Sequence, residues 1–286
     1  MARTRKVGSP IGYSGSAGLT GFVSVWATTA INETITIPTQ AGAFNAVVDW
    51  GDSSPPETIT SSTGFVHTYA TAGDHTISIT GQFPNIYFNN GGDKAKIKKV
   101  LNLGTVGWTR FDNAFFGCNA LTDFTVGTAD SSLVNNMLRM FQSCTSLTSL
   151  NLSALDTSSV NNVATMFYNC TSLETIDVSG LDTALVSNMS AVFRDCISAT
   201  SIVGVEDWDI TGLNSTGDLT NFLTVGSMTT AQYDALLVKW RAQDPFNGMT
   251  PSFGASTYTG GSAAATARQD LIDIDGWSIS DGGIAP

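Results

Sequence analysis

Met166-Phe167-Tyr168-Asn169-Cys170-Thr171-Ser172-Leu173 is one copy of a phrase that recurs along the middle of this 286-residue chain. The cysteines set its period, since each lies 26 residues after the previous one: Cys118, Cys144, Cys170 and Cys196. A phenylalanine lies three residues before each cysteine: Phe115, Phe141, Phe167 and Phe193. Because several columns keep the same step, this stretch is an internal repeat.

A period of 26 residues is typical of leucine-rich repeats, whose units stack because one unit cannot bury its own apolar face. Each unit contains a short strand in which apolar and polar residues alternate, as in Leu150-Asn151-Leu152 and Ile176-Asp177-Val178. The alternation turns the apolar residues inward and places Asn151 and Asp177 on an outer face.

The remainder of each unit must return the chain to the next strand. Apolar positions over residues 160–167 predict a short helix or turn for this return. The repeat decays after Cys196, where Trp208 replaces the aspartate of its column. We therefore predict a leucine-rich-repeat solenoid over residues 93–224, with atypical units at its ends.

The cysteine column predicts a structural ladder. Each thiol has the same apolar neighbours in sequence, so the four thiols stack in the core, where free cysteine is commonly found. A zinc site needs four thiolates that converge on one point, and stacked coils keep them apart. We predict neither a metal site nor disulfides.

An aspartate column recurs at Asp130, Asp156 and Asp182. These carboxylates are candidates for a cation-binding ladder, but stacked like charges repel one another. The repeated Asp-Thr-Ser instead predicts that each side chain accepts a hydrogen bond from the backbone of its own turn.

The repeat phrase, together with Leu155-Asp156-Thr157-Ser158-Ser159-Val160, resembles the BspA-like leucine-rich repeats of microbial surface proteins. The resemblance covers about 100 residues. It implies surface display and adhesion rather than catalysis.

Residues 21–92 predict a β-sandwich, because turn residues separate short strands rich in β-branched and aromatic residues. Two phrases, Val48-Asp49-Trp50-Gly51-Asp52 and His67-Thr68-Tyr69-Ala70-Thr71-Ala72-Gly73-Asp74-His75-Thr76-Ile77, are similar to those of PKD-like immunoglobulin-fold domains of extracellular and viral surface proteins. The resemblance implies an immunoglobulin-like sandwich.

This unit also contains the candidate metal-binding and acid–base residues of the N-terminal part. Asp49, Asp52 and Asp74 lack the dense spacing of a calcium loop, which leaves a Ca²⁺ site a minor alternative. His67 and His75 are the only histidines, and we interpret His67 as a packed strand residue. With no catalytic motif in the chain, we predict no enzyme, no catalytic residue and no cofactor.

Residues 225–286 predict a small α/β cap over the last unit of the solenoid. Apolar residues at helical spacing predict helices over residues 230–243 and 262–273. Trp277-Ser278-Ile279-Ser280 predicts a final strand. A cap of this kind covers an edge that would otherwise favour end-to-end association.

Charge is sparse and unevenly placed. Charged residues make up 13% of the chain, against about 25% in an average soluble protein, and the net charge is −11. No cationic stripe for nucleic acid is visible, and no apolar run approaches the ~20 residues of a spanning helix. Residues 1–20 carry only basic charges, which favours equally a disordered tail and a flexible basic arm that anchors through Arg3, Arg5 and Lys6.

Taken together, these features favour a mainly β, non-enzymatic structural and adhesion protein on a bacteriophage virion surface, outside the cell after lysis. A head fibre, decoration protein or tail-fibre component fits, with the arm and sandwich bound to capsid or tail proteins. The solenoid would then bind host glycans or proteins weakly and at many copies, and Tyr168 and Trp108 join Asn151 and Asp177 as candidate contacts. For Trp108, a place in the core is an equal alternative. The alternatives are a cellular surface adhesin exported without a classical signal and, less favoured, a glycan-cleaving enzyme on a fibre. The sequence does not set the oligomeric state, since no coiled-coil heptad indicates a trimer.

Overall fold

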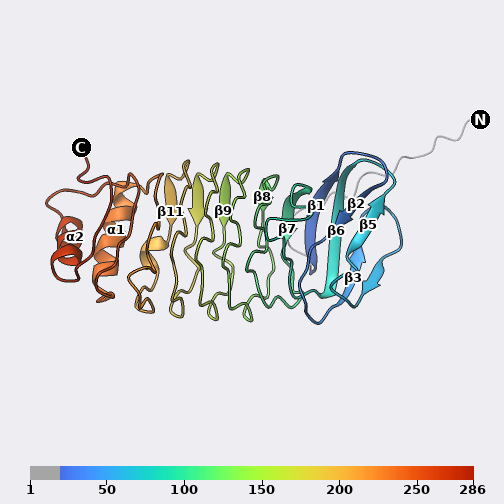
Figure 1. Ribbon diagram of the computed structural model, residues 1–286, viewed down its shortest axis with the longest axis horizontal. Helices are drawn as coiled ribbons and strands as arrows, with labels where there is room; N and C mark the ends of the chain where they lie inside the picture. The colour runs from blue at the N-terminus through green and yellow to red at the C-terminus, as the bar shows by residue number, and fades with distance from the viewer. Residues whose placement is uncertain (1–19) are drawn as a thin grey trace, which may run out of the picture.

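The computed structural model describes residues 20–286 and is an elongated, mainly β molecule. Figure 1 shows short strands side by side along the long axis, with an N-terminal sheet at one end and two helices at the other. The buried side chains of all these parts form one continuous apolar cluster. The mainly β prediction, with helices at the C-terminal end, is confirmed.

The N-terminal part contains two sheets. The larger has the strand order β4-β3-β6-β1-β7-β8, and a smaller one pairs β2 with β5. The strand bounds are β1 Phe22–Thr28, β2 Glu33–Thr36, β3 Asn45–Asp49, β4 Glu57–Ile59, β5 Val66–Tyr69, β6 Gly73–Gln82, β7 Ile97–Asn102 and β8 Asp123–Phe124. The smaller sheet contacts the larger through Tyr69, whose ring stacks on His75 with 3.6 Å between centroids.

β7 joins the N-terminal part to the repeats. It pairs with β1 in antiparallel fashion and with β8 in parallel fashion, so one sheet crosses the predicted boundary between residues 92 and 93. The Asn102 side chain adds to this junction, because its Nδ2 donates to Gly21 O at 2.7 Å and its Oδ1 accepts from Thr128 N at 2.8 Å. The two parts therefore share both a sheet and a core.

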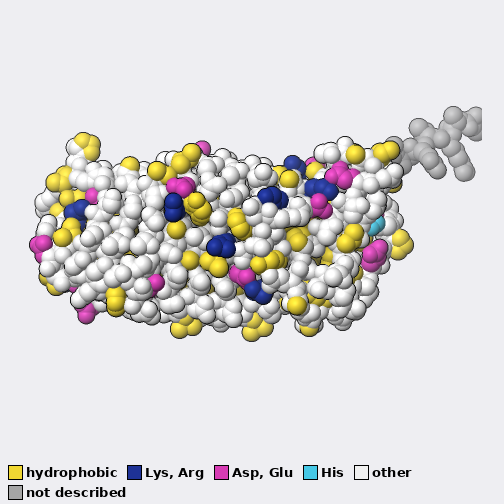
Figure 2. Space-filling view, in the orientation of Figure 1, with side chains coloured by type: hydrophobic (Ala, Val, Ile, Leu, Met, Phe, Trp, Pro, Cys, Tyr) yellow, Lys and Arg dark blue, Asp and Glu magenta, His cyan; other side chains and the backbone are white. Residues whose placement is uncertain are grey.

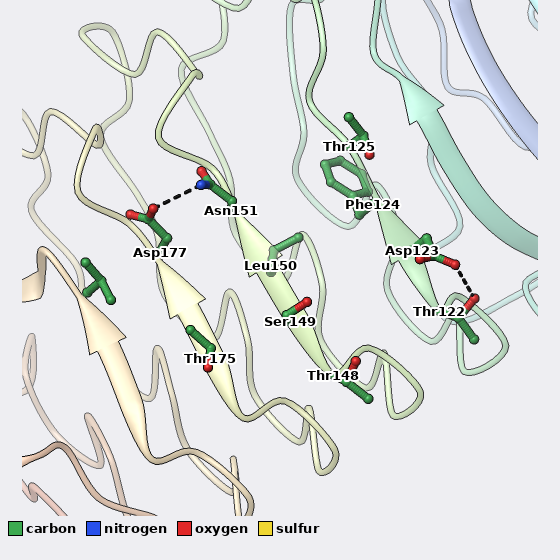
Figure 3. Close-up of a pocket in the computed structure, with 11 residues that line it drawn as sticks. Thr122, Asp123, Phe124, Thr125, Thr148, Ser149, Leu150, Asn151, Thr175 and Asp177 are labelled. Atoms are coloured by element: carbon green, nitrogen blue, oxygen red, sulfur yellow. Dashed lines mark hydrogen bonds between the residues drawn. The ribbon is translucent and has the colours of Figure 1, made fainter. Parts of the chain in front are cut away.

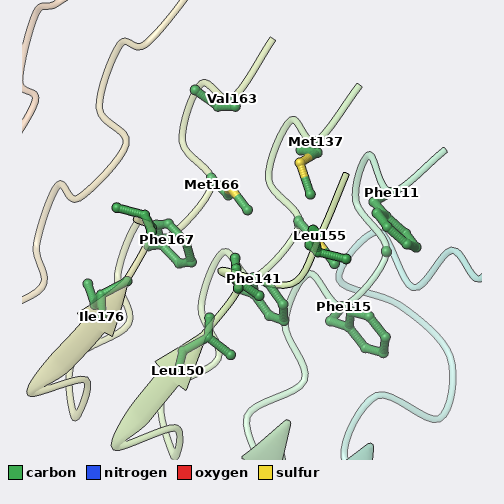
Figure 4. Packing of buried hydrophobic residues seen from close by; sticks show 14 of the residues in the cluster. Phe111, Phe115, Met137, Phe141, Leu150, Leu155, Val163, Met166, Phe167 and Ile176 are labelled. Carbon is green, nitrogen blue, oxygen red and sulfur yellow. The ribbon is translucent and has the colours of Figure 1, made fainter. Parts of the chain in front are cut away.

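The repeats form stacked coils with the predicted 26-residue step. β9 (Ser149–Asn151), β10 (Thr175–Asp177) and β11 (Ser201–Val203) pair in parallel, and each residue lies opposite the one 26 positions later. The column phenylalanines are fully buried and stack face to face, with centroids 5.8, 5.9 and 5.3 Å apart along the series. Figure 4 shows Phe115, Phe141 and Phe167 of this ladder with aliphatic and methionine side chains around them.

The return segment over residues 160–167 is a series of turns, not a helix. Thr165 lies within it and has a left-handed φ of 54°, and Arg139 and Ala191 repeat this conformation one coil away on either side. A left-handed residue interrupts a right-handed helix. Its N–H is satisfied by the next coil instead, since Thr165 N donates to Ser190 O at 2.9 Å.

The last coil corrects one prediction. Asp209, not Trp208, continues the aspartate column, because Asp209 N donates to Thr183 Oγ1 at 2.7 Å just as Asp182 N donates to Thr157 Oγ1. One extra residue in this coil shifts the column. Trp208 instead lies in the core, with its ring centroid 5.9 Å from that of Phe193.

A helical pair follows a short 3₁₀ helix, η1 (Val205–Asp207). α1 (Thr230–Arg241) begins at a capping box formed by Thr229 and Gln232, and α2 (Ala263–Asp273) begins after the capping side chain of Ser262. Both helices lie within two residues of their predicted bounds. α1 packs its apolar face onto the last coil, and Gln232 Nε2 donates to Ser201 Oγ of β11 at 3.1 Å.

The predicted final strand over residues 277–280 is wrong. Only one isolated bridge forms there, between Ser280 and Ser252. Trp277 is buried, and its Nε1 donates to Phe246 O at 3.0 Å. The backbone of this segment bonds to residues 249–253, since Ser278 N donates to Met249 O at 2.8 Å and Ser280 N to Pro251 O at 3.1 Å, but it forms no continuous strand.

Candidate ligand-binding groove on the strand face

A groove of about 470 Å³ crosses the outer face of the solenoid strands. Its volume lies within the range of about 300 to 1,000 Å³ that is typical of small-molecule sites. Figure 3 shows the groove over β8, β9 and β10. The lining residues are Thr122, Asp123, Phe124, Thr125, Thr148, Ser149, Leu150, Asn151, Thr175, Asp177 and Val203.

Strand alternation positions these side chains. Phe124 and Leu150 point inward and are 8% and 4% exposed, so they form an apolar floor. Their neighbours along each strand point outward and are exposed. The groove therefore combines an apolar floor with a polar rim.

The strand ladder is interrupted at this groove. Within residues 20–286, β8 ends the six-stranded sheet and β9 begins the three-stranded one, so no strand pairing joins them. The same two coils stay paired on their other side, where Asn113 N donates to Leu138 O at 2.8 Å and Phe115 N to Met140 O at 2.9 Å. The two coils thus lack strand pairing on the strand face, while backbone hydrogen bonds join them on the other side.

A large side chain lies at this interruption. The column that holds Leu150, Ile176 and Ile202 in later coils holds Phe124 here. The ring of Phe124 meets those of Phe115 and Phe141 edge to face, with centroids 5.2 and 4.8 Å apart. It therefore packs between two rungs of the phenylalanine ladder.

The rim carries hydroxyl groups without internal partners. Thr125, Thr148, Ser149 and Thr175 line the groove, and their hydroxyls make no hydrogen bond to any residue that the structure describes. A hydroxyl both donates and accepts hydrogen bonds, so these groups are free to bind a polar ligand. Sequence reasoning missed these hydroxyls, although Ser149 and Thr175 directly precede the inward residues Leu150 and Ile176, a signal that could have found them.

Of the predicted contact residues, Asn151 and Asp177 are the two that meet in the groove. Asn151 Nδ2 donates to Asp177 Oδ2 at 3.0 Å. Asn151 Oδ1 accepts from Ser153 N at 2.9 Å, and the other carboxylate oxygen, Asp177 Oδ1, accepts from Ser179 N at 3.1 Å. Both residues therefore shape the turn at the groove rim as well as line it.

The charge of the groove is partly neutralised. Lys99 Nζ of β7 lies 2.9 Å from Asp123 Oδ2. The hydrogen bond from Lys99 holds the pKa of Asp123 below its ordinary value, so this carboxylate is ionised at neutral pH. Asp177, in contrast, has an amide as its side-chain partner across the groove.

The other two predicted contacts lie elsewhere. Trp108 is fully buried, so its prediction as a surface contact is wrong; its ring packs against Phe22 and its Nε1 donates to Leu103 O at 3.1 Å. Tyr168 does not line the groove, and its ring lies under the Arg194 guanidinium at 5.3 Å. The proposed anchoring residues Arg3, Arg5 and Lys6 lie outside the described residues.

The cysteines form the predicted structural ladder. All four are free and buried. Each thiol from the second onward donates to a phenylalanine carbonyl of the previous coil: Cys144 to Phe115 O at 3.2 Å, Cys170 to Phe141 O at 3.0 Å and Cys196 to Phe167 O at 3.1 Å. Burial raises the pKa of these thiols, which keeps them protonated.

Two of the three column aspartates accept from the backbone of their own turns, as predicted. Asp156 Oδ1 accepts from Ser158 N at 3.1 Å, and Asp182 Oδ1 accepts from Ala184 N at 3.0 Å. Asp130 accepts from the Ser132 hydroxyl. Among residues 20–286, no group of histidine, cysteine, aspartate or glutamate side chains is arranged to hold a metal ion.

In the N-terminal sheets, His67 packs as predicted. Its ring stacks on Trp50 with centroids 5.0 Å apart, and its Nε2 lies 2.8 Å from Asp52 Oδ2. The candidate calcium ligands are engaged separately, because Asp49 Oδ1 accepts from Gly51 N at 2.9 Å while Asp52 binds His67. Asp49, Asp52 and Asp74 are not part of any group of side chains within residues 20–286 that is arranged to hold a metal ion.

Comparison with known proteins finds one similarity, which covers the repeats. Residues 109–225 match a family model described as "Mycoplasma protein of unknown function, DUF285". This family is leucine-rich-repeat-like, in agreement with the stacked coils. No curated protein and no solved structure matches the chain. The comparisons thus support the repeat part of the resemblance, and they include no PKD domain and no phage protein.

The described part of the chain, residues 20–286, includes no helix long and apolar enough to span a membrane. Lys and Arg side chains are scattered over the face seen in Figure 2, where they form no continuous stripe. Lys96, in the lysine-rich turn before β7, is bound by Glu33 and Asp93, each at 3.0 Å.

Proposed function

We propose that this chain is a non-enzymatic adhesion protein that presents the outer strand face of its solenoid to a host surface. The groove supports this proposal most, because it combines a floor of apolar side chains with hydroxyls that lack internal partners. A binding site on rigid stacked strands loses little conformational freedom when its ligand binds.

The finer parts of the proposal come from the sequence. The repeat phrase resembles BspA-like leucine-rich repeats, and the N-terminal phrases resemble PKD-like domains of extracellular and viral surface proteins. On this basis we propose a bacteriophage virion surface as the location, with capsid or tail proteins as partners. The N-terminal residues and sheets would attach to the particle and leave the solenoid free.

Weak contact is enough for such a protein. Many copies on one particle bind a surface with an avidity that exceeds the affinity of a single groove. The proposal therefore needs no deep pocket, no cofactor and no catalytic residue.

Co-sedimentation with purified phage particles from the same source tests the location. The full chain and a variant without residues 2–20 are compared. Binding by the full chain, with loss on truncation, is the expected result and assigns attachment to the basic segment. Equal binding by both chains would move attachment to the sheets or the cap. Binding by neither would overturn the virion proposal in favour of a cellular surface adhesin.

Adhesion is tested by binding of the fluorescently labelled full chain to intact host cells. Saturable binding that unlabelled protein displaces is expected. An absence of binding at every concentration up to the solubility limit would refute the adhesion proposal.

A further inference from the structure

We propose that the groove over β8, β9 and β10 binds a neutral saccharide, and that Phe124 opens the groove by holding the coils of β8 and β9 apart on their strand face. This inference rests on the proposed adhesive function, to which it adds the class of ligand. It concerns one site with a defined lining rather than the strand face as a whole.

The polar rim suits a ligand that carries many hydroxyls. Thr125, Thr148, Ser149 and Thr175 each offer one donor and two acceptor positions that no described residue uses. Sugar hydroxyls are likewise both donors and acceptors, so the two sets can pair in either direction. Asp177 Oδ1 accepts from Ser179 N and Oγ, and its Oδ2 accepts from Asn151 Nδ2, so Oδ2 adds one further acceptor position for a ligand hydroxyl.

The apolar floor suits the other surface of a sugar. Phe124 and Leu150 lie side by side beneath the rim and retain a small exposed fraction each. The C–H faces of a pyranose ring are apolar, and they can rest on such a floor while the hydroxyls reach the rim. A purely polar ligand would leave this surface uncovered.

Charge selects against acidic ligands. Asp123 and Asp177 both line the groove, and one cation, Lys99, pairs with Asp123. A sulfated or sialylated sugar would place an anion near the unneutralised Asp177 carboxylate. A neutral sugar avoids this repulsion. Its hydroxyls can pair with both the donor and the acceptor positions of the rim hydroxyls, whereas a cation can use only their oxygen atoms.

Phe124 determines that the groove exists at this coil. Later coils have Leu150, Ile176 and Ile202 in its column, and their strands pair without interruption. The Phe124 ring packs edge to face between Phe115 and Phe141 and so occupies the space that would let β8 approach β9. Replacement by leucine gives the column its usual side chain.

The experiment measures binding of the full-length chain to soluble oligosaccharides by isothermal titration calorimetry and saturation-transfer NMR. The probes are neutral tri- and tetrasaccharides of glucose, galactose, mannose and N-acetylglucosamine, with sulfated and sialylated sugars and a lysine-rich hexapeptide for comparison. We expect at least one neutral probe to bind more tightly than every charged probe. Tighter binding of the charged sugars or of the peptide, or no binding of any neutral probe, would overturn the inference.

Three variants test the site. Thr148→Val and Thr175→Val remove one hydroxyl each and keep the β-branched shape, and each is expected to weaken binding about fivefold. Phe124→Leu is expected to weaken binding more and to protect the Val126 amide from hydrogen exchange as β8 and β9 pair. Thr58→Val is the matched control, since Thr58 is an exposed strand residue of β4 whose side chain has no hydrogen bond in the described structure.

The outcomes separate this inference from the proposed function. Host-cell binding that survives Thr148→Val, Thr175→Val and an excess of neutral sugars would refute the groove and leave adhesion standing. Sugar binding that these variants weaken, without any binding to cells, would support the groove and refute adhesion. Thermal unfolding of each variant, followed by circular dichroism, identifies any loss that is due to misfolding. If Phe124→Leu does not fold, the two threonine variants still decide the result.

Discussion

Truncation of one rung of the phenylalanine ladder, Phe167→Ala, is expected to destabilise the whole molecule. Phe167 is fully buried and stacks between Phe141 and Phe193, with centroids 5.9 and 5.3 Å away. Truncation of a buried phenylalanine typically costs about 3 to 5 kcal/mol of unfolding free energy. Two ring contacts of about 0.5 to 1.5 kcal/mol each are lost as well, so we expect a value in the upper part of that range.

Two further variants separate the causes of this loss. Phe167→Leu keeps most of the buried volume and removes both ring contacts, so about 1 to 2 kcal/mol of destabilisation is expected. Tyr168→Ala is the matched control, because Tyr168 is adjacent but half-buried and makes a cation–π contact with Arg194 that is worth about 1 kcal/mol or less.

Equilibrium unfolding in urea, followed by far-ultraviolet circular dichroism, measures these differences. A single transition is expected, since one apolar cluster runs from the N-terminal sheets to the helical pair. The reasoning would be refuted if Phe167→Ala lost less than about 1 kcal/mol, or no more than Tyr168→Ala. Separate transitions for the two ends would refute the shared core instead.

Three other predictions concern single groups. The four cysteines are buried and have raised thiol pKa values, so a thiol reagent should label none of them in the folded protein and all of them in urea; labelling without denaturant would contradict the ladder. Hydrogen bonds from Thr29 N–H and then Lys96 lower the pKa of Glu33 to about 2, so stability from this carboxylate should be present above pH 4.5 and lost as the pH falls towards 2. In thermal unfolding between pH 2 and 5, Glu33→Gln should lose less stability than the unchanged protein as the pH falls. An unchanged pH dependence of the melting temperature would contradict a stabilising role for the Glu33 carboxylate. Asp156→Ala removes the acceptor of Ser158 N–H and should lower the free energy of unfolding in urea by about 0.5 to 1.5 kcal/mol. An unchanged free energy of unfolding would contradict this prediction.

Several features of the fold follow from residue spacing along the chain alone. The 26-residue step of the cysteines and phenylalanines implied stacked coils, because identical units place equivalent residues one above another. The stacking of equivalent residues also predicted free, buried thiols. The repeated Asp-Thr-Ser predicted that the aspartates form turns. The bounds of the first C-terminal helix followed from apolar residues at helical spacing.

Other features depended on contacts between distant residues. Trp108 was a candidate surface residue by position in the repeat, yet its indole is buried against Phe22, which lies 86 positions earlier. The sequence placed Trp208 in the aspartate column, but one inserted residue moves this column to Asp209. The segment at residues 277–280 alternates like a strand, but only one bridge forms there.

The repeat, its inward and outward columns and the order of sheets, coils and helices along the chain can therefore be derived from the sequence alone. The period of a solenoid is a property of each unit and its nearest neighbour, and both are visible along the chain. The tertiary structure alone decided that β7 joins the N-terminal sheet to the coils and that the ladder opens between β8 and β9. That opening depends on how the Phe124 ring packs between Phe115 and Phe141, and side-chain packing in a dense core is set by all its neighbours together.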